Sequence, residues 1–276
     1  MQLDSKREEF EKRGIKVAAV SFDPVAVLQS FAQRTSLKLT LLSDPESKVI
    51  RGFGILNESI PKDHQFYGIP NPGDYLIDEN GVVKAKFFEE KYADRYTAGE
   101  ILVRTLGADA SGSRTRTETD HLNLTASASD EILRGGNRLS LVVEVDLKPK
   151  MHVYAPGVEG YIPIDWSMEE VSGITNYGAE YPGSEMLHLP AINETVPVYQ
   201  GRFKIVRDLM IGQSKEIQHL LNTRGELVVK GSFRYQACDD KICYLPKTVP
   251  IEWTFRLEEH DRTRAPEEIR RKAGGN

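Results

Sequence analysis

The sequence predicts two units of different fold class, an α/β unit followed by an all-β sandwich. Residues 1–106 alternate between helical and strand patterns, whereas apolar residues from about Leu122 onward recur with a period of two. Between these parts, residues 107–121 have no apolar periodicity and are rich in Gly, Ser, Thr and charge. That composition is typical of a linker.

The first unit combines helix, strand and turn signals in the order of a layered α/β sheet. Val17–Ser21 is a short, continuous apolar run, as in strands that are buried on both faces. Glu79-Asn-Gly81 is a strong hairpin signal between two strand patterns. Helices are expected at residues 2–13, 24–33, 46–53 and 97–106, and strands at residues 17–21, 37–42, 75–78 and 82–88.

The second unit, residues 122–258, shows strand patterns separated by Gly and Pro turns, and no long helical pattern. This combination predicts an all-β sandwich. Residues 259–276 are charged and end in Gly-Gly-Asn, so we expect a frayed or weakly helical tail. Strands are expected at residues 139–147, 162–168, 203–209, 227–233 and 249–257.

Composition excludes several classes of function. The chain has 276 residues and a formal net charge of −5, without the basic surplus of a nucleic-acid-binding protein. A run of about 18 apolar residues is absent, so no transmembrane segment is expected. Residues 1–10 are polar and charged, which argues against a signal peptide. Two cysteines cannot build a disulfide scaffold or fill a zinc site alone, but they can form one redox pair that needs no other cofactor.

The two cysteines, Cys238 and Cys243, lie in the segment YQACDDKICYLPKTVP between two strand patterns. If this loop turns back as a hairpin, their Cα atoms stand about 4.5–5.5 Å apart, within the roughly 4.4–6.8 Å that a disulfide needs. Closing so short a ring stabilises a protein by only about 2 kcal/mol, which favours a redox role over a structural one. Metal binding with histidines such as His152 and His188 is disfavoured, because the spacing is not that of a zinc finger.

Three stretches of the first unit, EEFEKRGIKVAAVSFD, LTLLSDPESKVIRGFGI and GIPNPGDYLIDENGVVKAKFFEE, resemble redoxins of the AhpC/TSA peroxiredoxin type. The resemblance implies a thioredoxin-like fold in which Pro72, or alternatively Pro70, is a cis proline facing the reactive cysteine. In that family the cysteine begins the helix that ends in EEFEKRG.

Residues 1–106 of this chain contain no cysteine, so this half has no thiol nucleophile with which to reduce a peroxide. The strand that precedes the cysteine in the resembling fold is missing as well, which leaves a gap between strands. We therefore expect the thioredoxin-like unit to be incomplete, as in an N-terminally truncated fragment or a chain with a late start codon.

The stretches YQACDDKICYLPKTVPIEW, LKPKMHVYAPG and PVYQGRF are similar to the N-terminal periplasmic domain of the thiol:disulfide interchange protein DsbD. This resemblance implies an immunoglobulin-like sandwich in the periplasm or cell envelope. Its cysteine pair, here Cys238 and Cys243, would exchange electrons with membrane-embedded or thioredoxin-like partners. The acidic-aromatic cap loop of the family has no direct counterpart, so Ile192, Asn193 and Glu194 form either a different cap or a plain surface loop.

The residues next to the pair predict how it exchanges. Asp239 and Asp240 disfavour a thiolate at Cys238, and Lys241 partly offsets them. A helix N-terminus that would lower the cysteine pKa is not evident. We therefore expect a receptive disulfide that is attacked by the low-pKa thiol of a partner and exchanges through a mixed disulfide.

Accessibility favours Cys243 as the sulfur that faces the partner, and Tyr244 is a candidate to pack over the disulfide. Tyr154, Tyr199 and Tyr235 are expected as core or rim residues rather than catalytic acids. Three functions stay open: a thiol:disulfide oxidoreductase, a peroxiredoxin-type antioxidant protein whose catalytic cysteine lies upstream, and a binding module with an inert disulfide. The resemblance of the second half favours the first of these.

Overall fold

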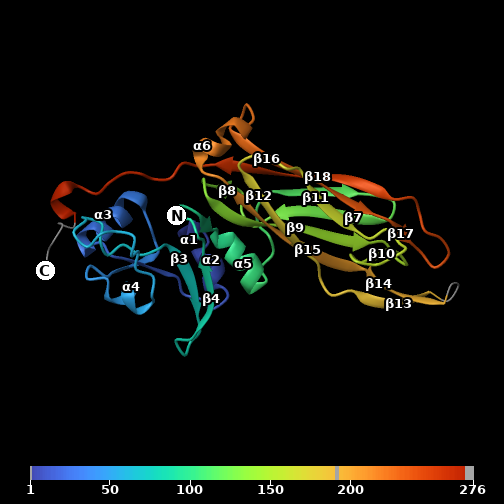
Figure 1. Cartoon of the computed structure of the whole chain (residues 1–276), viewed down its shortest axis with the longest axis horizontal. Helices are drawn as coiled ribbons and strands as arrows, with labels where there is room; N and C mark the ends of the chain where they lie inside the picture. The colour runs from blue at the N-terminus through green and yellow to red at the C-terminus, as the bar shows by residue number, and fades with distance from the viewer. Residues whose placement is uncertain (1, 190–192, 271–276) are drawn as a thin grey trace. The chain divides into compact units, whose positions relative to one another are not determined.

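The computed structural model describes residues 2–189 and 193–270, and the chain divides into two compact units (Figure 1). One unit runs to Ala98 and includes the segment from His260 onward, and the other spans Gly99–Glu259. Among the described residues, no helix is long and apolar enough to cross a membrane.

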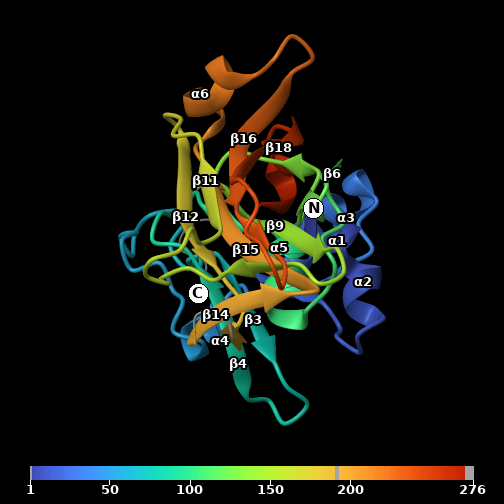
Figure 2. The same ribbon diagram turned by 90° about the vertical axis from the view of Figure 1, so that its right-hand side faces the viewer.

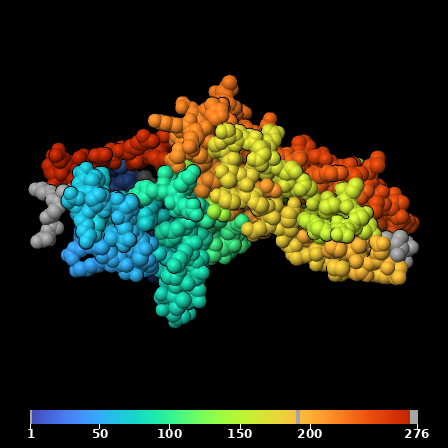
Figure 3. All heavy atoms as spheres, in the orientation of Figure 1, coloured from blue at the N-terminus to red at the C-terminus, as the bar shows by residue number. Residues whose placement is uncertain are grey.

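The first unit contains two small sheets with helices between their strands. β1 and β2 pair in parallel, and β3 and β4 form an antiparallel hairpin whose turn projects from the unit in Figure 3. The two pairs are separate two-stranded sheets. The elements are α1 (Gln2–Ser5), α2 (Arg7–Glu11), β1 (Ala18–Ser21), α3 (Val25–Thr35), β2 (Thr40–Ser43), α4 (Lys48–Gly52), β3 (Gly73–Ile77), β4 (Val83–Phe88), β5 (Arg95–Tyr96) and η2 (Glu267–Ile269).

The cis peptide bond expected at Pro72 is not found in the structure. The peptide bonds of the described residues are all trans, including those before Pro70 and Pro72. An X–Pro bond adopts the cis form only where its surroundings enforce it. Pro72 lies with Asn71 and Phe88 in the wall of a surface cavity of about 960 Å³, where it is only partly packed.

The second unit is a β-sandwich built from three sheets (Figure 2). Their strand orders are β12-β15-β9-β7-β6, β11-β16-β18-β8 and β13-β14-β10-β17. The elements are α5 (Ala98–Leu106), β6 (Arg114–Glu118), β7 (Leu122–Ala128), β8 (Ile132–Leu133), β9 (Asn137–Leu147), β10 (His152–Tyr154), β11 (Asp165–Met168), β12 (Ile174–Glu180), β13 (Glu185–Leu189), β14 (Glu194–Gln200), β15 (Arg202–Ile211), α6 (Ser214–Ile217), η1 (Gln218–Leu220), β16 (Glu226–Tyr235), β17 (Ala237–Cys238) and β18 (Lys247–Leu257).

Part of the expected linker, residues 107–121, is a strand. β6 (Arg114–Glu118) pairs with β7 along its whole length and forms the edge of its sheet. Its side chains are almost all exposed, so the strand has no buried face and leaves no apolar period in the sequence. Backbone pairing, which composition does not reveal, creates this strand.

The interior of the sandwich is apolar and includes both tryptophans. Trp166 and Trp253 are at most 1% exposed, and their rings stack with centroids 5.7 Å apart. The indole N–H of Trp253 donates a hydrogen bond of 2.9 Å to the carbonyl oxygen of Ser127. Hydrophobic burial of this kind gives the second unit a rigid base for its third sheet.

The third sheet separates the interior from a second, smaller buried cluster. Val153 and Ala237 are register partners on β10 and β17 and belong to the interior. Side chains alternate along a strand, so the neighbouring residues of each lie on the opposite face. There Tyr154, Val198 and Cys238 form the smaller cluster. The alternation of side chains thus places Ala237 in the hydrophobic core and the next residue, Cys238, on the outer face of the sheet.

Candidate redox site

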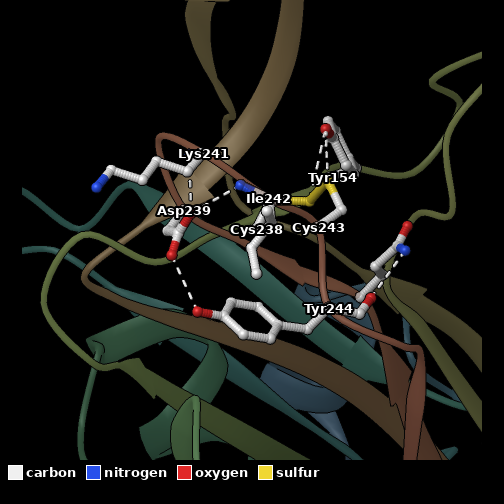
Figure 4. Close-up of a disulfide and its surroundings, with 8 residues drawn as sticks. Tyr154, Cys238, Asp239, Lys241, Ile242, Cys243 and Tyr244 are labelled. Carbon is white, nitrogen blue, oxygen red and sulfur yellow. Dashed lines mark hydrogen bonds between the residues drawn. A yellow bond between two sulfur atoms is a disulfide. The ribbon is translucent and has the colours of Figure 1, made fainter.

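Cys238 and Cys243 form a disulfide, with an S–S distance of 2.02 Å and a Cα–Cα distance of 4.0 Å (Figure 4). The two residues also oppose one another as an antiparallel bridge, which is the hairpin arrangement expected from their spacing, although their Cα atoms lie closer together than the expected range. Cys238 ends β17 and is 1% exposed, whereas Cys243 is exposed. Cys243 is thus the more accessible residue of the pair.

Asp239 shapes the loop between the cysteines. Its Oδ1 accepts backbone hydrogen bonds from Lys241 (2.8 Å) and Ile242 (2.9 Å), and its Oδ2 accepts one from the Tyr244 hydroxyl (2.9 Å). These donors hold the pKa of Asp239 below its usual range. The carboxylate is thus mainly an organiser of the loop, and three hydrogen bonds balance its charge.

The other residues predicted around the pair lie farther from the sulfurs. Asp240 and Lys241 are exposed, and Figure 4 shows the Lys241 side chain pointing away from the disulfide. Tyr244 does not pack over the disulfide as expected. Its hydroxyl donates a hydrogen bond to Asp239, and its ring packs at a tilt against His121, with centroids 4.5 Å apart.

The tyrosine that contacts the disulfide is Tyr154. Its hydroxyl lies 3.7 Å from the Sγ atoms of both Cys238 and Cys243 (Figure 4). Tyr154 is 1% exposed, and burial, together with the charge of Glu194, raises its pKa. The hydroxyl therefore stays protonated and can donate a hydrogen bond to sulfur.

Glu194, a predicted cap residue, is connected to the disulfide through two tyrosines. The Tyr161 ring packs on Tyr154 with centroids 4.3 Å apart, and its hydroxyl donates to Oε2 of Glu194 at 2.5 Å. This hydrogen bond raises the pKa of Tyr161 to about 12. Asn193 is exposed with a positive φ of 53°, and Ile192 lies outside the described residues.

Sequence reasoning named His152 only as a disfavoured metal ligand, yet it lies directly beside the site. His152 on β10 is the register partner of Cys238, and its ring meets that of Tyr154 edge-on at 5.6 Å. It is 2% exposed, and its Nε2 has no hydrogen-bond partner among the described residues. Burial lowers the pKa of His152. Among the described residues, no cluster of three or more His, Cys, Asp or Glu side chains is arranged to hold a metal ion.

Two family matches, together with the Cys238–Cys243 disulfide, support a thiol–disulfide redox function in general terms. Residues 126–253 match the family described as thiol:disulfide interchange protein DsbD, N-terminal. Residues 1–86 match the AhpC/TSA family. Both resemblances predicted from the sequence are confirmed.

Individual relatives match the first unit. Peroxiredoxin Q of Arabidopsis thaliana is 36% identical over 91 residues, which cover 32% of this chain and 39% of that protein. Peroxiredoxin Q of Suaeda salsa is 35% identical over 91 residues, covering 32% of this chain and 40% of the relative. The chain thus spans about two fifths of the length of these curated relatives.

One solved structure aligns with about half of the chain. The N-terminal periplasmic domain of ScsB from Proteus mirabilis aligns with a TM-score of 0.37 and 13% sequence identity. The alignment covers 52% of this chain and 51% of that structure.

Proposed function

We propose that this chain is a thiol:disulfide oxidoreductase that relays electrons between proteins through Cys238 and Cys243. The observation that carries the proposal is the asymmetry of the disulfide, which joins one exposed and one buried cysteine residue. A partner thiolate attacks Sγ of Cys243, the Cys238–Cys243 bond breaks, and Cys238 departs with the electron pair. A second thiol of the partner then attacks the mixed disulfide, which leaves the partner oxidised and this chain reduced.

The match to the DsbD N-terminal family supports partners that are thioredoxin-like or membrane-embedded thiol:disulfide proteins. We place this exchange in the periplasm or cell envelope, because disulfides persist in oxidising compartments. The cysteine pair itself accepts two electrons as the disulfide and passes them on as the dithiol. No added cofactor enters the proposed reaction.

Single-cysteine variants test which sulfur receives the partner. Cys238→Ala leaves an exposed thiol, and Cys243→Ala leaves a buried one. Each variant is mixed with a one-cysteine thioredoxin activated as its thionitrobenzoate disulfide, and the release of coloured thionitrobenzoate is followed. We expect Cys238→Ala to form the mixed disulfide rapidly and Cys243→Ala to form it at least about tenfold more slowly, since the thiolate must be accessible. Equal rates, or no mixed disulfide with either variant, contradict the proposal.

The reduction potential of the pair separates an exchange disulfide from an inert one. It is measured by equilibration in glutathione buffers followed by alkylation and mass spectrometry. A value between about −270 and −120 mV supports the relay, and a value below about −300 mV marks a structural disulfide.

A second candidate function follows from the similarity of the first unit to peroxiredoxin Q over 91 residues. In this alternative, the Cys238–Cys243 dithiol reduces an oxidised peroxiredoxin-type cysteine of a longer protein or of a partner, since residues 1–106 contain none. A sulfenic acid and the dithiol would yield a thiol, the disulfide and water. Peroxide consumption that starts only when a peroxiredoxin is added to the reduced chain supports this alternative.

A further inference from the structure

Opening the disulfide at Cys243 creates an electrostatic problem at Cys238. The departing sulfur carries the negative charge, and Cys238 is 1% exposed. A buried charge is costly unless nearby groups stabilise or neutralise it. The residues around Cys238 must therefore supply a hydrogen bond or a proton.

Two side chains on β10 face this sulfur. His152 is the register partner of Cys238, and directly opposed residues of antiparallel strands have side chains on one face, with Cβ atoms roughly 4.5–5.5 Å apart. Tyr154, two residues farther along the same face, contacts the Cys238 sulfur through its hydroxyl at 3.7 Å. The Tyr154 hydroxyl supplies a hydrogen bond, but its raised pKa makes it a poor site for proton exchange near neutral pH.

The Nε2 atom of His152 can accept a proton, because it makes no hydrogen bond within the described residues. Buried polar atoms in folded proteins nearly always have a hydrogen-bond partner, yet Nε2 of His152 has none among the described residues. This open nitrogen belongs to the register partner of Cys238, the residue whose buried sulfur must gain a proton when the disulfide opens.

The charged groups near His152 come from the active-site loop. Asp239 and Asp240 favour its protonated form, whereas burial is the larger effect and lowers the pKa. The neighbouring strand β14 presents the uncharged Gln200 as its register partner. Behind Tyr154, the carboxylate of Glu194 is held by Tyr161. In the oxidised protein His152 is therefore neutral near neutral pH and available as a proton acceptor, with two carboxylates close enough to stabilise its cation.

We propose that His152 exchanges a proton with Cys238 during the opening and closing of the disulfide, an inference that rests on the proposed function. For closing, the Cys238 thiol transfers its proton to Nε2 of His152. The resulting thiolate attacks Sγ of Cys243 in the mixed disulfide, and the partner leaves as a thiolate. For opening, neutral His152 first takes up at Nε2 the proton that the partner thiol releases when it ionises to the attacking thiolate. His152 then gives this proton to the departing Cys238 sulfur.

The test measures the Cys238 thiol directly. In the Cys243→Ala protein, the rate of alkylation of Cys238 by iodoacetamide is followed against pH, alone and combined with His152→Gln. A thiol paired with an imidazole ionises at lower pH than an isolated one. We expect His152→Gln to raise the midpoint of the profile by about one pH unit or more. His188→Gln is the matched control, because His188 is an exposed histidine of the same sheet whose ring nitrogen is hydrogen-bonded to Thr195.

A second measurement uses the unmodified chain and does not depend on the folding of a variant. The nitrogen chemical shifts of the His152 ring are compared in the oxidised and reduced proteins across pH. Reduction is expected to shift Nε2 toward its hydrogen-bonded or protonated range and to raise the pH at which the ring titrates. Unchanged ring shifts, or equal midpoints for His152→Gln and His188→Gln, overturn the inference.

The two proposals fail separately. If a partner is trapped at Cys243 but His152→Gln does not change the pH midpoint of Cys238 alkylation, the relay stands and the proposed role of His152 is wrong. If the Cys238 profile responds but no partner is trapped, the proton exchange stands and the relay is wrong.

Discussion

The sandwich unit contains two buried polar clusters that differ in how completely their groups are bonded. In one, the carboxylate of Asp208, 2% exposed, accepts from Arg104 (2.9 Å), from two nitrogens of Arg138 (2.8 and 3.0 Å) and from Ser140 (3.1 Å). In the other, around the disulfide, Nε2 of His152 has no partner among the described residues. The Asp208 carboxylate is fully hydrogen-bonded, whereas His152 keeps bonding capacity in reserve, which the proposed proton exchange with Cys238 would use.

The largest expected effect comes from breaking the satisfied cluster. Asp208→Ala leaves the guanidinium groups of Arg104 and Arg138 without their shared carboxylate, so we expect the free energy of unfolding to fall by about 3–5 kcal/mol. Urea denaturation at neutral pH measures this. Asp146→Ala, an exposed aspartate on the same strand as Arg138, is the control and is expected to change stability by less than about 0.5 kcal/mol. A small effect for both variants would mean that the cluster is not structural.

Glu100, which lies near Asp208, is expected to make the stability of the sandwich unit depend on pH. Glu100 on α5 is 3% exposed, and burial together with nearby Asp208 raises its pKa from 4.5 to about 8. Because the folded pKa lies above the unfolded one, the contribution of Glu100 to stability is full below about pH 4.5 and is lost as the pH rises through about 8. Glu100→Gln is therefore expected to be close to the wild type in stability at pH ~5 and to be more stable by about 4 kcal/mol at pH ~9. Parallel stability curves for the two proteins would contradict this assignment.

Removing the disulfide separates stability from function. The double variant Cys238→Ala, Cys243→Ala loses a short ring, so we expect its free energy of unfolding to fall by only about 2 kcal/mol, and all thiol exchange to disappear. Chemical denaturation and the thionitrobenzoate assay measure the two effects. A loss comparable to that of Asp208→Ala would identify the disulfide as a principal structural element.

The smallest expected effect on stability is at Tyr154. Tyr154→Phe keeps the ring and removes the hydroxyl that contacts both sulfurs, so stability is expected to change by less than about 1 kcal/mol. Reduction by dithiothreitol is expected to slow about tenfold, because the departing thiolate loses a hydrogen bond. Tyr199→Phe is the matched control. It lies in the same sheet but on the interior face, and its hydroxyl bonds to the carbonyl oxygen of Pro182. Equal reduction rates for the two variants would remove Tyr154 from the reaction.

The disulfide was predictable because its signal is local. Cys238 and Cys243 are five positions apart, and turn and strand signals around them are enough to bring them together. Trp166 and Trp253 likewise follow from strand periodicity. In contrast, Tyr154 is 84 positions from Cys238, on a strand of three residues that is too short to show a period. Its position beside the sulfurs depends on the pairing of β10 with β17, which no local pattern encodes.

The secondary structure also divides into elements that local sequence signals predict and elements that depend on tertiary contacts. The Asp78–Val82 turn and the parallel pair β1–β2 follow from turn chemistry and apolar runs. In the second unit, the strand β6 was missed because its side chains are exposed on an edge and leave no apolar signal. The cis bond expected at Pro72 came from a resemblance alone, and isomer choice depends on tertiary packing that a short motif does not contain.

The hydrogen bonds of Asp239 have a kinetic consequence for any mixed disulfide. Together with the backbone bonds Asp239 N to Ile242 O (3.0 Å) and Tyr244 N to Ala237 O (2.9 Å), they hold the loop closed without help from the sulfur–sulfur bond. The two thiols therefore stay at a high effective molarity after reduction. Under the proposed function, a partner bound at Cys243 would be displaced by a Cys238 thiol that is already in place. The lifetime of the covalent complex would then be set by chemistry at Cys238 rather than by a search of the loop.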